Sequence, residues 1–178
     1  MKKRTTKQPL IKRLLLVSLC CSFSALSNEH FVDKSGEAEV IKALKEDNVS
    51  LAKTAFSHLN ESQKSSLTGQ ILHSRILFRD DKTEESYEIL EELSESNQDN
   101  DDIYYFFGRS AIVMAQKVSI FSKLSYASDA LEAWEHVLTI NPNHIKTLEG
   151  LIGFYIGAPS IAGGDIEQAL KHSQTLVK

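Results

Sequence analysis

The 178-residue chain has 20 basic and 24 acidic side chains, a formal net charge of −4, and two cysteines. An acidic chain is a poor general binder of nucleic acid or of anionic membranes, which argues against both of those classes. Both cysteines, Cys20 and Cys21, lie near the amino terminus, so the rest of the chain has no disulfide framework and no cysteine nucleophile.

The amino-terminal segment has the pattern of a secretory signal. Residues 1–13 carry six basic side chains and no acidic one. An apolar run of about 13 residues follows, which is well short of the roughly 20 that span a bilayer. Ala25 and Ser27 are small residues that would lie three positions and one position before a cleavage site after Ser27. We therefore expect a signal peptide of residues 1–27. Its removal leaves 14 of the 20 basic side chains against all 24 acidic ones, a net charge of −10.

Two alternatives stay open for this segment. One is an uncleaved membrane anchor, and the other is a lipoprotein that is acylated on Cys20 or Cys21. The lipoprotein pattern is incomplete, because Leu19 precedes Cys20 where a small residue is expected. We therefore expect cleavage and export of residues 28–178, without a membrane span.

Residues 28–178 amount to one domain and show helical spacing throughout. Apolar residues recur at intervals of three and four, and alternation typical of strands is nowhere sustained. Runs of this kind are "EAEVIKALKE", "SLAKTAFSHL", "ESYEILEELSE" and "ALEAWEHVLTI". The sequence predicts an all-α chain.

Four segments share one pattern, in which a small residue is followed by a second position four residues on and a third position three further. They are Ala52-Phe56-Leu59, Ser86-Leu90-Leu93, Ala130-Trp134-Val137 and Ala169-Ser173-Leu176. Their small residues lie 34, 44 and 39 positions apart, which indicates a 34-residue period with insertions of ten and five residues. A small residue lets two helices approach closely, and the bulky residue one turn later fills the groove beside it. We therefore expect Trp134 in the core rather than as a ligand platform.

This pattern resembles the tetratricopeptide repeat family, whose helix pairs have characteristic large, small and aromatic positions. The third unit matches best, with Tyr104, Phe107, Gly108 and Ala111 on its first helix, Ala130, Trp134 and Val137 on its second, and Pro142 closing it. The first-helix positions of the other units are Leu148, Leu151, Ile152 and Tyr155; Gln70, His73, Ser74 and Leu77; and Gly36, Glu39, Val40 and Ala43. The match covers residues 33–178 and is stronger in the second half. The resemblance implies a right-handed α-solenoid of about four antiparallel helix pairs.

The ten-residue insertion lies between Ala111 and Ala130. Ile112, Ala115, Ile120 and Leu124 keep helical spacing within it. We expect longer helices here that project beyond the repeats and are broken near Ser125.

The five-residue insertion falls in "APSIAGGD", residues 158–165. Pro159 should stop one helix, Gly163-Gly164 supply free backbone torsion, and Asp165 cap the next helix with Gln168 three residues on. A ligand loop is the weaker interpretation, because the segment lacks the Lys-Ser/Thr of a phosphate loop and Asp165 would repel an anion. Similar connectors occur in exported bacterial proteins of the family, so the resemblance implies a periplasmic location.

Neither catalysis nor a metal site is predicted. The chain has no nucleophile motif and no paired carboxylates that stand out, and its six histidines show no metal-helix spacing. His73 is expected as a buried, hydrogen-bonded core histidine. We expect no enzyme activity and no cofactor.

In the resembling family, the first helices line a concave groove. Its positions transfer here to Arg75, Phe78, Arg79, Tyr105, Arg109 and Lys146 as partner-binding residues, with Ile71, Ile112 and Glu149 beside them. Arg75 and Arg109 occupy the same position in successive units and should be neighbours. Two guanidinium groups and a tyrosine suit a carboxylate, such as a peptide C-terminus. The alternative is that each arginine pairs with acids on adjacent helices.

These observations predict a periplasmic scaffold that binds a protein or peptide partner in its groove. The alternative is a small-ligand-binding component of an envelope transport system, with its pocket beneath the two insertions. The last helix lacks a polar capping helix after it, so further chain, a partner or a second copy of the protein would cover that face.

Overall fold

Helices make up all the regular secondary structure that the computed structural model describes, which is residues 35–177 without the side chains of residues 120 and 121. They are α1 (Ser35–Lys45), α2 (Val49–Ser57), α3 (Glu61–Ser65), α4 (Leu67–Arg79), α5 (Thr83–Ser96), α6 (Asp101–Lys117), α7 (Ile120–Ile140), α8 (Ile145–Gly157), the 3-10 turn η1 (Ser160–Ala162) and α9 (Ile166–Leu176). The all-α prediction is confirmed for this range. The expected signal peptide and its cleavage site lie outside the described residues.

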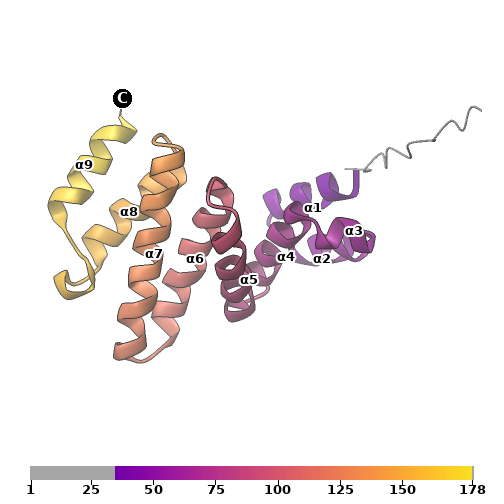
Figure 1. Ribbon diagram of the computed structural model, residues 1–178, viewed down its shortest axis with the longest axis horizontal. Coiled ribbons are helices and arrows are strands. Elements are labelled where there is room, and N and C mark those ends of the chain that lie inside the picture. Colours follow the sequence, from indigo (N-terminus) through magenta and orange to yellow (C-terminus); the bar gives the residue numbers. More distant parts are fainter. Residues whose placement is uncertain (1–34, 178) are drawn as a thin grey trace, which may run out of the picture. The chain divides into compact units, whose positions relative to one another are not determined.

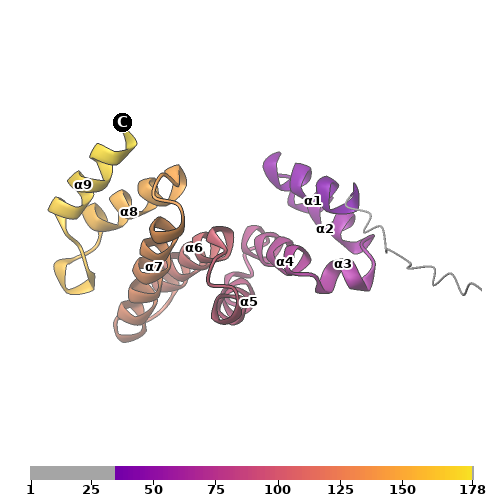
Figure 2. The same ribbon diagram turned by 45° about the horizontal axis from the view of Figure 1, so that its top comes forward.

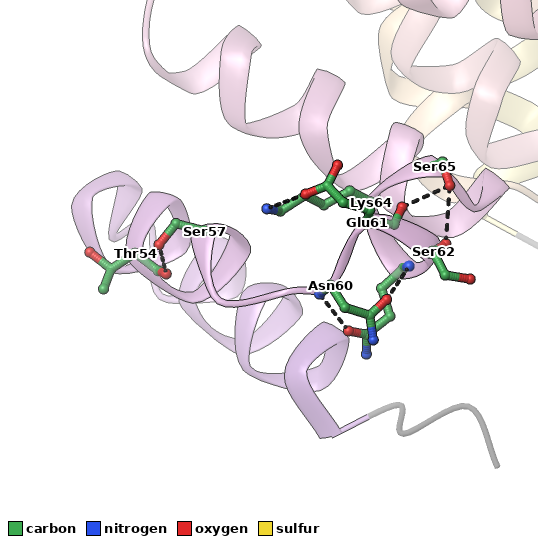
Figure 3. A network of polar contacts seen from close by, with 8 residues as sticks. Thr54, Ser57, Asn60, Glu61, Ser62, Lys64 and Ser65 are labelled. Atoms are coloured by element: carbon green, nitrogen blue, oxygen red, sulfur yellow. Dashed lines mark hydrogen bonds and ion pairs between the residues drawn. The ribbon is translucent and has the colours of Figure 1, made fainter. Parts of the chain in front are cut away.

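Polar residues begin several of these helices by accepting hydrogen bonds from the first turn. The side chains of Asn48, Ser66 and Asn100 each accept from the backbone N–H three residues on. Asn60 and Gln63 form a reciprocal capping box at α3, part of the polar network in Figure 3. Such caps contribute about 1 kcal/mol each. α3 was not predicted, because five residues are too few to show an apolar period.

Apart from α2 and α3, consecutive α-helices of the described range pack side by side in chain order (Figures 1 and 2). The four predicted pairs, α1 with α2, α4 with α5, α6 with α7, and α8 with α9, all pack together, and α6 with α7 is the most extensive contact among the described helices. Neighbouring pairs meet where α5 packs on α6 and α7 packs on α8, while α4 also contacts both α1 and α6. Within the described range, no helix is long and apolar enough to cross a bilayer.

The four small anchor residues are all buried where two helices meet. Ala52, Ser86 and Ala130 have no exposed surface, and Ala169 is 4% exposed. Ser86 on α5 hydrogen-bonds to Ser110 on α6, and the two buried hydroxyl oxygens lie 3.1 Å apart. The predicted role of these residues as close-packing positions is confirmed.

Three groups of buried apolar side chains form the core, and each joins helices that are near one another in the chain. The first joins α1, α2 and α4 through residues that include Val40, Ala52 and Leu72. The second extends from α4 to α7, and the third extends from α6 to α9 around Trp134. The core is therefore built from local contacts along the chain.

The first insertion differs from its prediction in the place of the helix break. α6 ends at Lys117, Val118 and Ser119 are extended, and α7 then runs without interruption through Ser125. The carbonyl of Ser119 accepts the first helical hydrogen bond, from the N–H of Lys123. The break comes earlier because a β-branched residue followed by serine favours extended backbone, whereas Ser125 lies on an exposed helix face.

The second insertion follows its prediction. α8 stops before Pro159, Gly163 adopts a left-handed φ of 95°, and Asp165 accepts from the N–H groups of Glu167 and Gln168. Gly164 is needed for a different reason. A Cβ there would lie 1.8 Å from the carbonyl oxygen of Ala158, so the turn closes too tightly for a side chain.

Candidate functional site

The predicted groove residues come from three helices that are not consecutive in the chain. Arg75, Phe78 and Arg79 lie on α4 at a spacing of three and four residues, which places them on one face. Tyr105 and Arg109 are one turn apart on α6, which contacts α4. Lys146 is in the first turn of α8.

Arg75 and Arg109 each lie over a phenylalanine ring on the other's helix. The guanidinium carbon of Arg75 is 4.6 Å from the ring centroid of Phe106, and that of Arg109 is 4.7 Å from the centroid of Phe78. Arg109 also lies 5.8 Å from the ring centroid of Tyr105. Such contacts contribute about 0.5–1 kcal/mol at exposed sites, and they hold the planar guanidinium in a defined orientation.

Of the four cationic side chains in this set, only Arg79 forms an ion pair with an acid of the described residues. Arg79 forms an ion pair with Asp47, in the turn between α1 and α2, as the alternative interpretation expected. Within residues 35–177, no carboxylate oxygen lies within 4.0 Å of a side-chain nitrogen of Arg75, Arg109 or Lys146. Three cations therefore stay available to an anion from outside this part of the chain.

The electrostatic environment of Arg75 favours an incoming anion. Burial lowers the pKa of Arg75, the carboxylate of Asp102 raises it, and the positive charge of Arg109 lowers it. A guanidinium remains charged at physiological pH, so the lowered pKa means that its charge is partly removed from water. A carboxylate beside Arg75 would compensate for the lost hydration.

Two adjoining hollows contain all six predicted residues. The larger, of about 230 Å³, is lined by Phe78, Tyr105, Arg109, Ile112, Val113, Trp134, Lys146 and Gly150. The smaller, of about 50 Å³, is lined by Leu44, Arg75, Phe78, Arg79, Phe106, Arg109 and Lys146. We call these two hollows together the arginine groove.

Some residues fall elsewhere than the sequence suggested. Ile71 is buried in the core and does not line the groove, and Glu149 is exposed outside the lining. Phe106 lines the groove but was not predicted. The sequence gives little indication of this role, because the place of Phe106 in the groove depends on how α4 crosses α6 and does not follow from a repeat position.

Trp134 fixes the wall of the groove. Its indole N–H donates a hydrogen bond to the backbone carbonyl of Tyr105, with a nitrogen-to-oxygen distance of 3.1 Å. A Cβ on Gly108 would lie 2.6 Å from the indole, and one on Gly150 would lie 3.1 Å from it. Glycines on α6 and α8 therefore admit the ring between them, and the side chain is 6% exposed, as its core role predicted.

A separate hollow, the insert cavity, is lined by residues of both insertions and has a volume of about 430 Å³. Its lining consists of Ile112, Ala115, Gln116, Lys123, Ala127, Trp134, Gly150, Gly153, Phe154, Gly157, Ala158, Pro159 and Ala162. Almost all of these side chains are small or apolar. The lining comes from α6, α7, α8 and the connector before α9.

Other titratable groups do not assemble into a site. In the described range, no three His, Cys, Asp or Glu side chains are grouped to hold a metal ion. His73 is half-buried and stacks on Phe56, with ring centroids 5.1 Å apart, instead of lying fully buried as expected.

No protein-family model matches the chain, and no curated protein matches it significantly in sequence.

Proposed function

We propose that the chain is an exported scaffold protein whose arginine groove binds a protein or peptide partner through a carboxylate. The observation that carries this proposal is the pair of arginines held over aromatic rings. In a chain of net charge −4, Arg75 and Arg109 lie over Phe106 and Phe78, and neither forms an ion pair with an acid among residues 35–177. A fixed planar fork is the group that binds a carboxylate with two parallel hydrogen bonds.

We infer that the helices form a right-handed solenoid of tetratricopeptide-repeat type. Four helix pairs that pack in chain order, each with a buried small residue on its second helix, support this inference. Such arrays present their first helices along one surface, here α1, α4, α6 and α8. Three of these helices supply the predicted groove residues.

We place the protein in the bacterial periplasm on the basis of its amino-terminal pattern and its connector sequence. The role that we propose is binding without catalysis. A scaffold needs a preformed surface with a few oriented charges, and the arginine groove provides one.

A peptide library tests the proposal directly. The full chain, recovered after expression and immobilised, would be used to select peptides with free C-termini. Each enriched peptide would then be resynthesised as its C-terminal amide. We expect the acid to bind at least about tenfold more tightly than the amide, since a charge-assisted hydrogen bond contributes about 1.5–3 kcal/mol. Equal affinity of acid and amide for every enriched peptide, or no enrichment, would refute the proposal.

A second candidate function is a small-ligand-binding component of an envelope transport system. The observation that favours it is the insert cavity, whose volume of about 430 Å³ falls within the usual range for small-molecule sites. Mass spectrometry of ligand extracted from the purified protein tests this candidate. A protein that retains no small molecule and binds none would contradict it.

A further inference from the structure

The insert cavity combines an apolar lining with one charged side chain. Gln116 and Lys123 are its polar lining side chains apart from Trp134, whose N–H is bonded to the carbonyl of Tyr105. Lys123 is exposed, and no acidic side chain within residues 35–177 forms an ion pair with it. A ligand that matches this lining is apolar along its length and negatively charged at one end.

The glycines of α8 give a second reason to expect a ligand. Gly150 is required by Trp134, as described above, but a Cβ on Gly153 or Gly157 would meet nothing within 4 Å. Glycine destabilises a helix relative to alanine, and Gly153 lies well inside α8. No contact within the described chain accounts for its missing side chain. Gly153 lines the insert cavity, so without a side chain it leaves the backbone of α8 accessible from the cavity.

We infer that the insert cavity binds a free fatty acid. Its hydrocarbon chain lies along Gly153, Phe154 and Ala127, and its carboxylate meets the ammonium group of Lys123. The match of charge selects the acid over an uncharged or cationic amphiphile of the same length. This inference rests on the second candidate function and is independent of the arginine groove.

Trp134 provides the signal for a direct test, because it is the only tryptophan and lines the cavity. The full chain would be titrated below the critical micelle concentration with octanoate, decanoate and dodecanoate, each also prepared with a terminal bromine as a contact quencher. We expect the bromine to quench the fluorescence of Trp134. We also expect the affinity to increase about fourfold per added methylene until the cavity is full. Absence of binding, or an affinity that does not depend on chain length, would overturn the inference.

Head-group and cavity variants locate the site. Decan-1-ol and decyltrimethylammonium should bind more weakly than decanoate, and Lys123→Gln should weaken decanoate a few-fold while leaving decan-1-ol unchanged. Gly153→Leu should abolish binding of all three by filling the cavity, and it should leave the protein folded, since the Cβ at this position meets nothing within 4 Å. Gly157→Leu repeats this test at a second position. Binding that survives both leucine variants would refute the assignment.

The arginine groove is the control for a misplaced site. The double variant Arg75→Gln/Arg109→Gln should bind decanoate as the unmodified protein does. Loss of decanoate binding in this variant, with Lys123→Gln unaffected, would move the fatty acid to the groove and overturn the inference. Failure of peptide selection would not alter any of these outcomes, so the two proposals fail separately.

Discussion

The indole nitrogen of Trp134 on α7 lies 3.1 Å from the carbonyl oxygen of Tyr105 on α6, the helix that carries Arg109. The hydrogen bond and the two glycines that flank the ring couple the core to the arginine groove. Both the groove and the insert cavity include Trp134 in their lining. The packing of one side chain therefore shapes two candidate binding surfaces.

Replacement of this side chain should be severely destabilising. We expect Trp134→Ala to lower the free energy of unfolding by about 3–5 kcal/mol, because it leaves a large void between helices. The matched control is Ser160→Ala in the exposed connector. This substitution should change the free energy of unfolding by less than about 0.5 kcal/mol. Chemical unfolding followed by circular dichroism measures both. A larger loss for Ser160→Ala would show that the repeat register is wrong.

The sequence predicted the pairs of helices because a repeated pattern constrains many residues at once. Ala52, Ser86, Ala130 and Ala169 share one register, and all four are buried. Single features were less predictable. The break at Val118 and the short helix α3 depend on a few local torsions, which no periodicity reports.

Most residues of the arginine groove could be predicted from the sequence, but the contacts between their side chains could not. The repeat positions gave Arg75 and Arg109 as neighbours on adjacent first helices. They did not reveal that each guanidinium lies over a phenylalanine of the other's helix, because this depends on the crossing of α4 and α6. Phe106 was missed for that reason, and Ile71 was assigned to the surface although it points into the core.

Two glycines should respond oppositely to alanine. Gly153→Ala adds a Cβ in open space and should raise the free energy of unfolding by about 0.5–1 kcal/mol, because alanine is the better helix former. Gly108→Ala places its Cβ 2.6 Å from the indole of Trp134. This substitution should lower the free energy of unfolding by about 1–3 kcal/mol. Thermal unfolding of the two variants under the same conditions gives the comparison. A stable Gly108→Ala protein would mean that Trp134 is not held between α6 and α8.

The buried hydroxyl pair of Ser86 and Ser110 should behave as one unit. Ser86→Ala or Ser110→Ala alone leaves a hydroxyl without its partner and should cost about 1–3 kcal/mol. The double variant should cost less than the sum of the two, since no hydroxyl is then left unpaired between α5 and α6. A double-mutant cycle in urea measures the coupling. Additive losses would indicate that the two hydroxyls do not interact.

His73 should make the protein less stable under mildly acidic conditions. Burial beside Phe56 lowers the pKa of His73 in the folded state, and the charge of Glu85 only partly opposes this. The unfolded chain therefore binds the proton first, so stability is complete above a pH of about 6.5 and falls as the pH drops below it. His73→Phe keeps the ring stack and should reduce this pH dependence. Urea unfolding midpoints at pH 7.5 and 5.5, measured for the unmodified protein and for His73→Phe, test this prediction. An identical decrease of the midpoint in both proteins would contradict it.

The arginine groove can be tested through the same peptides that the protein selects. Arg75→Gln and Arg109→Gln should each weaken binding of a free-acid peptide by about tenfold or more, and the double variant should bind acid and amide equally. Neither change should lower the melting temperature by more than a few degrees, because each removes only a partly exposed cation–π contact. Arg79→Gln, whose guanidinium is paired with Asp47, is the matched control and should have a smaller effect on binding.

Fluorescence anisotropy of one selected peptide, titrated with the unmodified protein and with Arg75→Gln/Arg109→Gln, is the most direct measurement of partner binding by this groove. The account predicts that the double variant loses the preference for the free acid while its circular dichroism spectrum and melting curve remain those of a folded helical protein. Unchanged affinity for the free-acid peptide in the folded double variant would contradict it.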